Sequence, residues 1–203
     1  MSRFRGALIW TVLVIAVAVP VGAAAMSSLL EYRSPVYIVA GFAGVIAMAL
    51  LLFQPLLAAG YLPGLSARRG RHVHQWSGSL LVLLVVAHVA GLWITSPPDV
   101  IDALLFVSAT PFSLWGVIAM WAVFTTACLA ALRRRLHLKP RTWRYSHKAL
   151  ALIIVAGTVV HVLQIDGTME FYSKVILCLL LVVVTVLAVI DYKFGRTVGK
   201  LQS

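Results

Sequence analysis

Six long apolar runs constrain the fold of this chain more than any other feature. The 203-residue sequence is 62% apolar, and it repeatedly shows uncharged stretches of about twenty residues, the length that crosses the hydrocarbon layer of a membrane. This composition excludes a soluble domain. We therefore predict an all-α integral membrane protein, with residues 1–203 forming a single six-helix bundle. The predicted spans are 7–26, 36–59, 76–95, 111–132, 148–165 and 172–190.

Turn-forming residues separate these spans. Tyr61-Leu62-Pro63-Gly64 ends the second span and Thr95-Ser96-Pro97-Pro98 ends the third, while Pro111 suits the first turn of the fourth. The first run follows Arg3 and Arg5, as in a signal peptide. Its length of about twenty residues favours a retained first helix over a cleaved signal.

The basic residues indicate how the spans are oriented. Fifteen of the seventeen lysine and arginine residues fall in the two termini and in the second and fourth loops, and only Arg33 and Lys174 fall on the other side. Because positive loops stay in the cytoplasm, we predict a multi-pass protein of a bacterial inner membrane with both termini cytoplasmic. Short juxtamembrane clusters explain the net charge of +11 without a nucleic-acid partner, and they can also contact anionic lipid of the bilayer.

Four histidines form two pairs with the same spacing. His74 and His88 are fourteen residues apart, and so are His147 and His161. Fourteen residues of α-helix return to within roughly 40° of the starting direction and rise about 21 Å. The third and fifth spans run in the same direction, so His74 and His147 are predicted at an inner level and His88 and His161 at an outer level. Each level can hold one six-coordinate haem between opposed imidazoles, which predicts two b-type haems.

Small residues lie one helical turn from each of these histidines. They are Gly78, Gly91, Ala151 and Gly157. A flat macrocycle lying against a helix needs such clearance, which makes the four residues candidates for haem packing. Close packing between membrane helices is the alternative explanation.

Other polar residues near the histidines have less specific signals. Arg71 and Arg144 each precede an inner histidine by three residues and are candidates for contacts with haem propionates, although topology signals explain them equally well. His72 would face nearly the opposite side of the helix from His88, and His137 lies in the basic loop. His137 is expected to be solvated, and His72 is a poor partner for His88 that stays open as an alternative to His74.

Aliphatic and small residues separate the two predicted levels. They are Leu81, Leu84, Val85, Ile154 and Thr158, and they would form a dry layer that electrons cross and ions do not. Cys128 and Cys178 lie in apolar runs, and the sequence has no CxxCH or CxxC motif. Covalent c-type haem and a zinc ribbon are therefore excluded, and both cysteines are expected to be packing residues.

The residues around the histidines resemble a known family. Arg71-x-x-His74-x-x-x-Gly78 followed by His88 resembles the third helix of the ferric-reductase-like transmembrane domain, and Trp143-Arg144-x-x-His147-Lys148 followed by His161 resembles its fifth helix. That superfamily includes NADPH oxidases, eukaryotic ferric reductases and the haem-binding membrane subunit of the bacterial periplasmic methionine-sulfoxide reductase system. The resemblance covers the six-helix core and implies axial ligation of two b-type haems by His74 with His147 and by His88 with His161.

Three departures from the family pattern accompany this resemblance. The second histidine pair is often thirteen residues apart in the family and is fourteen apart here, and Ser146 stands where a leucine is usual. The subunit of the sulfoxide system does not keep all four ligands, whereas this chain does. The resemblance therefore favours a generic two-haem member.

These expectations describe transmembrane electron transfer from a cytoplasmic donor to an acceptor at the outer face, such as a periplasmic protein. About a dozen residues follow the last span, and the cytoplasmic segments have no GxGxxG motif. A separate donor such as a flavin reductase, or a bound FMN or FAD, is therefore expected. The alternatives are a quinol-linked cytochrome b subunit that docks a periplasmic oxidoreductase, a single-haem subunit of a sulfoxide reductase system, and a non-redox transporter or scaffold. Whether the chain is itself an enzyme stays open.

Overall fold

The computed structural model describes the backbone of residues 3–201 and the side chains of residues 4–190. Its long helices are α1 (Arg3–Ala25), α2 (Pro35–Ala59), α3 (Ala67–Thr95), α5 (Pro111–Leu132), α6 (Pro140–Gln164) and α7 (Phe171–Leu201). Each of the six contains a stretch that is long and apolar enough to cross a membrane, and the described backbone contains no strand. The predicted all-α bundle with six spans is confirmed.

Helices α3 and α6 begin earlier than the hydropathy of their spans predicted. Ser66 caps α3, with its Oγ accepting a hydrogen bond from the backbone N–H of Arg69, and Pro140 occupies the first turn of α6. Hydropathy marks only the part of a helix that lies in lipid, whereas these two helices continue into the basic segments. As a result His74 and His147 each lie seven residues after the first residue of their helix.

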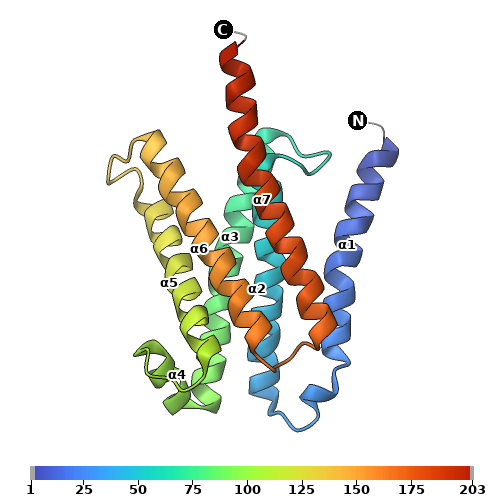
Figure 1. The fold of residues 1–203 in the computed structure, drawn as a ribbon, viewed down its shortest axis with the longest axis vertical. Helices are drawn as coiled ribbons and strands as arrows, with labels where there is room; N and C mark the ends of the chain where they lie inside the picture. Colours follow the sequence, from blue (N-terminus) through green and yellow to red (C-terminus); the bar gives the residue numbers. More distant parts are fainter. Residues whose placement is uncertain (1–2, 202–203) are drawn as a thin grey trace.

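Two short elements were not predicted. A single 3-10 turn, η1 (Ser28–Leu30), follows α1, and a short helix, α4 (Pro97–Leu104), follows α3. Proline at the start of α4 prevents α3 from continuing. A proline inside a helix has no backbone N–H to donate, and its ring clashes with the carbonyl of the residue four positions earlier. In Figure 1, α1 begins at the top of the bundle and α4 lies at the bottom, so the two are at opposite ends.

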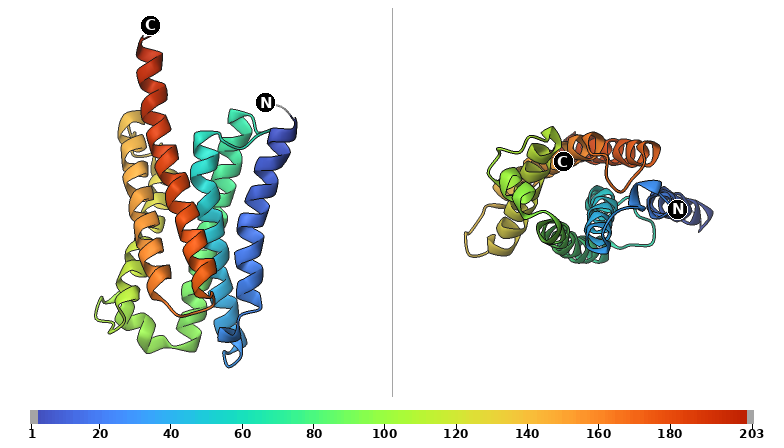
Figure 2. Two further views of the ribbon diagram at one scale, coloured as in Figure 1. Left: turned by 45° about the vertical axis from the view of Figure 1, so that its right-hand side comes forward. Right: turned by 90° about the horizontal axis from the view of Figure 1, so that it is seen from below.

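The bundle is built from two helical hairpins, α2–α3 and α5–α6, whose helices make the most extensive pairwise contacts. Helix α7 packs against α2 and α6 and so joins the hairpins, and α1 lies along α7 and α2 (Figure 1 and Figure 2). The start of α1, the end of α7, and the α2–α3 and α5–α6 connections lie at one end of the bundle. We call it the basic end, because Arg68, Arg69, Arg71 and the segment 133–148 lie there.

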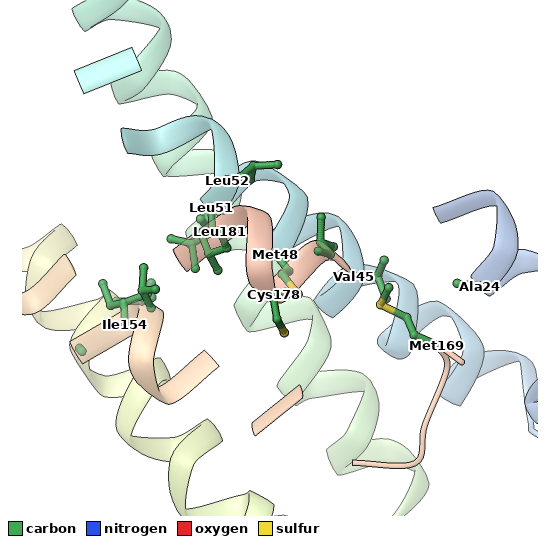
Figure 3. Close-up of a cluster of buried hydrophobic side chains, with 14 residues drawn as sticks. Ala24, Val45, Met48, Leu51, Leu52, Ile154, Met169, Cys178 and Leu181 are labelled. Atoms are coloured by element: carbon green, nitrogen blue, oxygen red, sulfur yellow. The ribbon is translucent and has the colours of Figure 1, made fainter. Parts of the chain in front are cut away.

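The hydrophobic core lies mainly where α7 meets the two hairpins. Leu52 of α2 and Leu177 and Leu181 of α7 are fully buried, and Ile154 of α6 belongs to the same cluster (Figure 3). Leu81 of α3 also belongs to it. The core therefore fixes both hairpins through α7.

Candidate functional site

The structure brings the predicted inner pair together. The imidazole rings of His74 on α3 and His147 on α6 have their centres 6.0 Å apart, and their planes meet at 71°. Two imidazole nitrogens bound to one metal ion at about 2.0 Å would also place the two ring centres roughly 6 Å apart. The rings meet edge to face, and the separation of their centres fits two ligands of one haem iron.

The Nδ1 atoms of both inner histidines are buried and have no hydrogen-bond partner. Among the described side chains they are the only buried nitrogen or oxygen atoms in this condition. Burying a polar group without a partner costs free energy, so such atoms call for an explanation. His74 faces the backbone of Gln54 without meeting it in hydrogen-bond geometry. The inner imidazoles therefore carry the buried side-chain nitrogens of the described residues whose hydrogen-bonding capacity is unused.

Trp143 orients one of the inner rings. Its indole stacks on His147, one helical turn later, with ring centres 5.0 Å apart and an interplanar angle of 29°. The guanidinium of Arg133 at the end of α5 lies 5.8 Å from the Trp143 ring, which links α5 to the same stack. The four-residue spacing of Trp143 and His147 in the sequence is the signal for this stacking.

The outer histidines are held differently, by backbone carbonyls. Nδ1 of His88 donates to the carbonyl of Ala40 on α2 at 2.7 Å, and Nδ1 of His161 donates to the carbonyl of Phe112 on α5 at 2.9 Å. A carbonyl oxygen can only accept, so the proton of each neutral ring resides on Nδ1. The lone pair then resides on Nε2, which is the tautomer that a metal-binding histidine needs.

Two glycines make these hydrogen bonds sterically feasible. A Cβ added to Gly44 would lie 3.0 Å from Nδ1 of His88, and one added to Gly116 would lie 2.7 Å from Nδ1 of His161. Each glycine follows the accepting residue by four positions, which is one helical turn. Because the glycine has no side chain, the imidazole ring can approach the carbonyl of the accepting residue. Sequence reasoning missed both glycines, because their relation to the histidines is a contact between helices.

The two hairpins thus repeat one arrangement. In each, the first helix supplies a carbonyl and a glycine four residues apart, and the second helix supplies the histidine that fits against them. At the inner level the backbone of Gln54, fourteen residues after Ala40, lies beside His74, but the hydrogen bond and the glycine are missing. The positions fourteen residues after the two glycines are Ala58 and Ala130, and the inner rings have no carbonyl partner.

The glycines that were predicted to pack against haem have contacts with neighbouring helices. A Cβ on Gly91 would lie 2.6 Å from Cβ of Ala40, and a Cβ on Gly157 would lie 3.0 Å from the carbonyl oxygen of Trp115. A Cβ on Gly78 would lie 3.7 Å from Oε1 of Gln54. These contacts show close packing inside each hairpin, the alternative explanation. Haem clearance by these glycines and by the half-buried Ala151 stays a prediction.

The two candidate propionate arginines and the other two histidines do not contact the inner histidine pair. Arg71 and Arg144 are exposed, and Nε of Arg144 donates to the carbonyl of Pro140 at 3.2 Å. Nε2 of His72 accepts a 2.9 Å hydrogen bond from the indole of Trp76, and His137 is exposed in the basic loop. The structure shows no contact between these arginines and the inner histidines, so a role toward propionates stays a prediction.

A buried lysine near the outer pair was not predicted as a site residue. The side chain of Lys174 on α7 is 4% exposed, and its Nζ donates to the carbonyl of Ile165 at 2.9 Å and pairs with the exposed carboxylate of Asp166 at 3.2 Å. Ile165 ends α6 one turn after His161. In the same connection the side chain of Thr168 contacts Gly41, the neighbour of Ala40. This segment therefore lies beside the end of the helix that carries His161 and beside the neighbour of Ala40, which supports His88.

The donor set suits haem better than a bare ion. Among the described residues, no three side chains of histidine, cysteine, aspartate or glutamate gather closely enough to hold a metal ion. The inner level instead brings two imidazoles together, which is the number of axial ligands that a haem iron takes up. The outer tautomers, which leave Nε2 free, fit this group.

Comparison with known proteins agrees with the geometry. Residues 40–158 match the family described as ferric reductase like transmembrane component. The matched region covers more than half of the chain and includes His74, His88 and His147, and it ends three residues before His161. No curated protein and no solved structure matches the chain. The chain belongs to the ferric reductase-like transmembrane family.

Proposed function

We propose that this protein transfers electrons across a membrane with two b-type haems as its cofactors. The family suggests electron transfer. The observation that supports two haems is the facing of His74 and His147, together with a second pair of histidines whose tautomers are fixed by Ala40 and Phe112. His74 with His147 would hold the inner haem and His88 with His161 the outer one. When bound, haem iron supplies reversible one-electron chemistry.

The chain's own residues would set the distance and the medium between the two levels. Fourteen residues of helix give a rise of about 21 Å between successive ligands. Leu81 and Ile154 are buried between the levels, and Leu84, Val85 and Thr158 are half-buried. This apolar layer excludes water and ions, and it offers no competing ligand.

The direction of transfer follows from charge. The basic end carries the lysines and arginines of the second and fourth loops, and by the positive-inside rule it would face the cytoplasm of a bacterial cell. A separate flavin reductase, or bound FMN or FAD, would donate electrons there. An acceptor at the outer face, such as a periplasmic protein, would receive them. His74, His147, His88 and His161 would hold the haems, which would supply one-electron transfer between the two faces.

An absorption spectrum of the purified protein from haem-replete cells tests the proposal. We expect a Soret band and, by haemochrome assay, two haems per chain. One haem per chain would remove the four-ligand arrangement, as in a single-haem sulfoxide reductase subunit. A colourless protein would contradict the proposal and favour a transporter or scaffold.

A second measurement separates the electron donors. The oxidised protein is mixed anaerobically either with NADPH and a flavin reductase or with a quinol, and the haem absorption is followed. We expect reduction in the flavin reductase mixture. Reduction by quinol alone would instead identify a quinol-linked cytochrome b subunit.

A further inference from the structure

A groove lined by arginines opens at the basic end, between the start of α3 and the end of α5. Its volume is about 760 Å³. Arg68, Arg69 and Arg71 line it from α3, and Arg133 lines it from the C-terminal cap of α5. Two segments more than sixty residues apart in sequence thus bring four guanidinium groups to one concave surface. We call this surface the arginine groove.

The described residues provide no carboxylate partner for the arginine groove. The one ion pair among them joins Lys174 to Asp166 at the opposite end of the bundle. Three of the four arginines also lie in the first two turns of α3, and that first turn contains no acidic residue. Because the N-terminus of a helix carries partial positive charge, these cations repel both the helix dipole and one another. A bound anion would relieve that repulsion.

The shape and chemistry of the groove select the kind of anion. Guanidinium groups present paired N–H donors that match the oxygens of a phosphate. The same groove is lined by the apolar side chains of Leu65 and Val73. His72 is also part of the lining, and its ring is fixed by the hydrogen bond from Trp76. A phosphate attached to an apolar body would therefore satisfy both parts of the lining.

We propose that the arginine groove is a binding site for a phosphate group carried by an amphiphilic molecule. The chemistry is shared by two sources, the headgroup of an anionic phospholipid and a soluble phosphate ester. The groove lies at the end of the membrane spans, where lipid headgroups are, and basic pockets between helices at this level are suited to such headgroups. The site does not depend on haem binding, so its test is independent of the proposed function.

The test compares two double variants of equal charge in the full-length protein. R68Q/R133Q removes one arginine from each wall of the groove. R134Q/R135Q removes two exposed arginines that do not line it. Each protein is purified in neutral detergent, and retention of phosphatidylglycerol against phosphatidylcholine is measured by native mass spectrometry. Far-UV circular dichroism verifies the helical fold, and R68K/R133K retains the charge if the glutamine variant unfolds.

We expect the affinity for phosphatidylglycerol to fall roughly thirtyfold in R68Q/R133Q, as removal of two charges near a lipid surface would produce, and to change less than twofold in R134Q/R135Q. In R68K/R133K we expect a smaller loss, because lysine lacks the paired donors. Equal losses in the two glutamine variants would overturn the site and indicate a general effect of charge. Failure of the wild-type protein to prefer phosphatidylglycerol over phosphatidylcholine, together with failure to bind inorganic phosphate, would also overturn it.

A competition experiment identifies the source of the phosphate. Inorganic phosphate and FMN are titrated separately against the protein with bound phosphatidylglycerol. Displacement by FMN at micromolar concentration would support the site with a soluble phosphate ester as its ligand. Retention of the lipid in both titrations would support the site with a phospholipid headgroup.

Discussion

The imidazole Nδ1 of His88 donates a 2.7 Å hydrogen bond to the backbone carbonyl of Ala40, forty-eight residues earlier in the chain. His161 has the equivalent bond to Phe112. No equivalent bond supports His74 or His147. The two predicted haem levels therefore differ in how firmly the protein holds their ligands before any haem binds.

Adding a methyl group at the outer carbonyl contacts should remove the outer haem selectively. G44A and G116A would each place a Cβ within 3.0 Å of Nδ1 of a histidine, which pushes the ring away from its carbonyl. Overpacking of this kind costs about 1–3 kcal/mol. We expect loss of one haem per chain by haemochrome assay and a lower midpoint of thermal unfolding. G22A is the matched control, because nothing lies within 4 Å of the added atom. Unchanged haem content in both G44A and G116A would contradict the role of the glycines.

Single histidine substitutions should fall into two classes. His74→Ala and His147→Ala are expected to remove the same haem, because their rings face each other at 6.0 Å, and His88→Ala and His161→Ala are expected to remove the other. Electron paramagnetic resonance of the oxidised protein would resolve the two low-spin signals. His72→Ala serves as the control, because the His72 ring accepts a hydrogen bond from Trp76 and is not a predicted haem ligand. If His74→Ala and His161→Ala removed the same signal, the pairing across parallel helices would be wrong.

Removing the stacked indole should weaken the inner level. Trp143→Leu abolishes the ring contact with His147, and Trp143→Phe keeps part of it. Aromatic pairs contribute about 0.5–1.5 kcal/mol beyond burial, so the affinity for the inner haem should fall roughly twofold to tenfold in the leucine variant and less in the phenylalanine variant. Haem titration of the protein purified without haem measures this. Trp121→Leu is the control, because its ring contacts Phe124 on α5. Equal effects of Trp143→Leu and Trp121→Leu would refute a specific role for the stack.

Neutralising the buried lysine should change the outer haem more than the inner one. Lys174→Met leaves the carbonyl of Ile165 without its donor, which costs about 1–3 kcal/mol of stability. It also removes a buried positive charge one helical turn beyond His161. A cation stabilises the reduced form of a nearby iron, because reduction lowers the iron's positive charge, so the outer potential should fall. Spectroelectrochemical titration should show that shift, and Lys174→Arg should restore most of it. Equal shifts at both haems would indicate a general structural effect instead.

The sequence by itself determined the number of spans, because each span is a local property of about twenty consecutive residues. Charge along the chain and an even number of spans determined that both termini share one end, which Figure 1 shows for α1 and α7. Helical periodicity put His74 and His88 on one stripe and His147 and His161 on another. The hydropathy of the spans misplaced the starts of α3 and α6, because both helices extend beyond the lipid into basic segments.

Only the tertiary structure decided which nitrogen of each outer histidine is available. That choice depends on the carbonyls of Ala40 and Phe112, which lie forty-eight and forty-nine residues away along the chain. The tertiary structure also decided three other features. They are the roles of Gly44 and Gly116, the burial of Lys174, and the convergence of four arginines on one groove. Each is a contact between separate helices, set by how α7 and the core hold the two hairpins. No periodicity within one helix encodes such a contact.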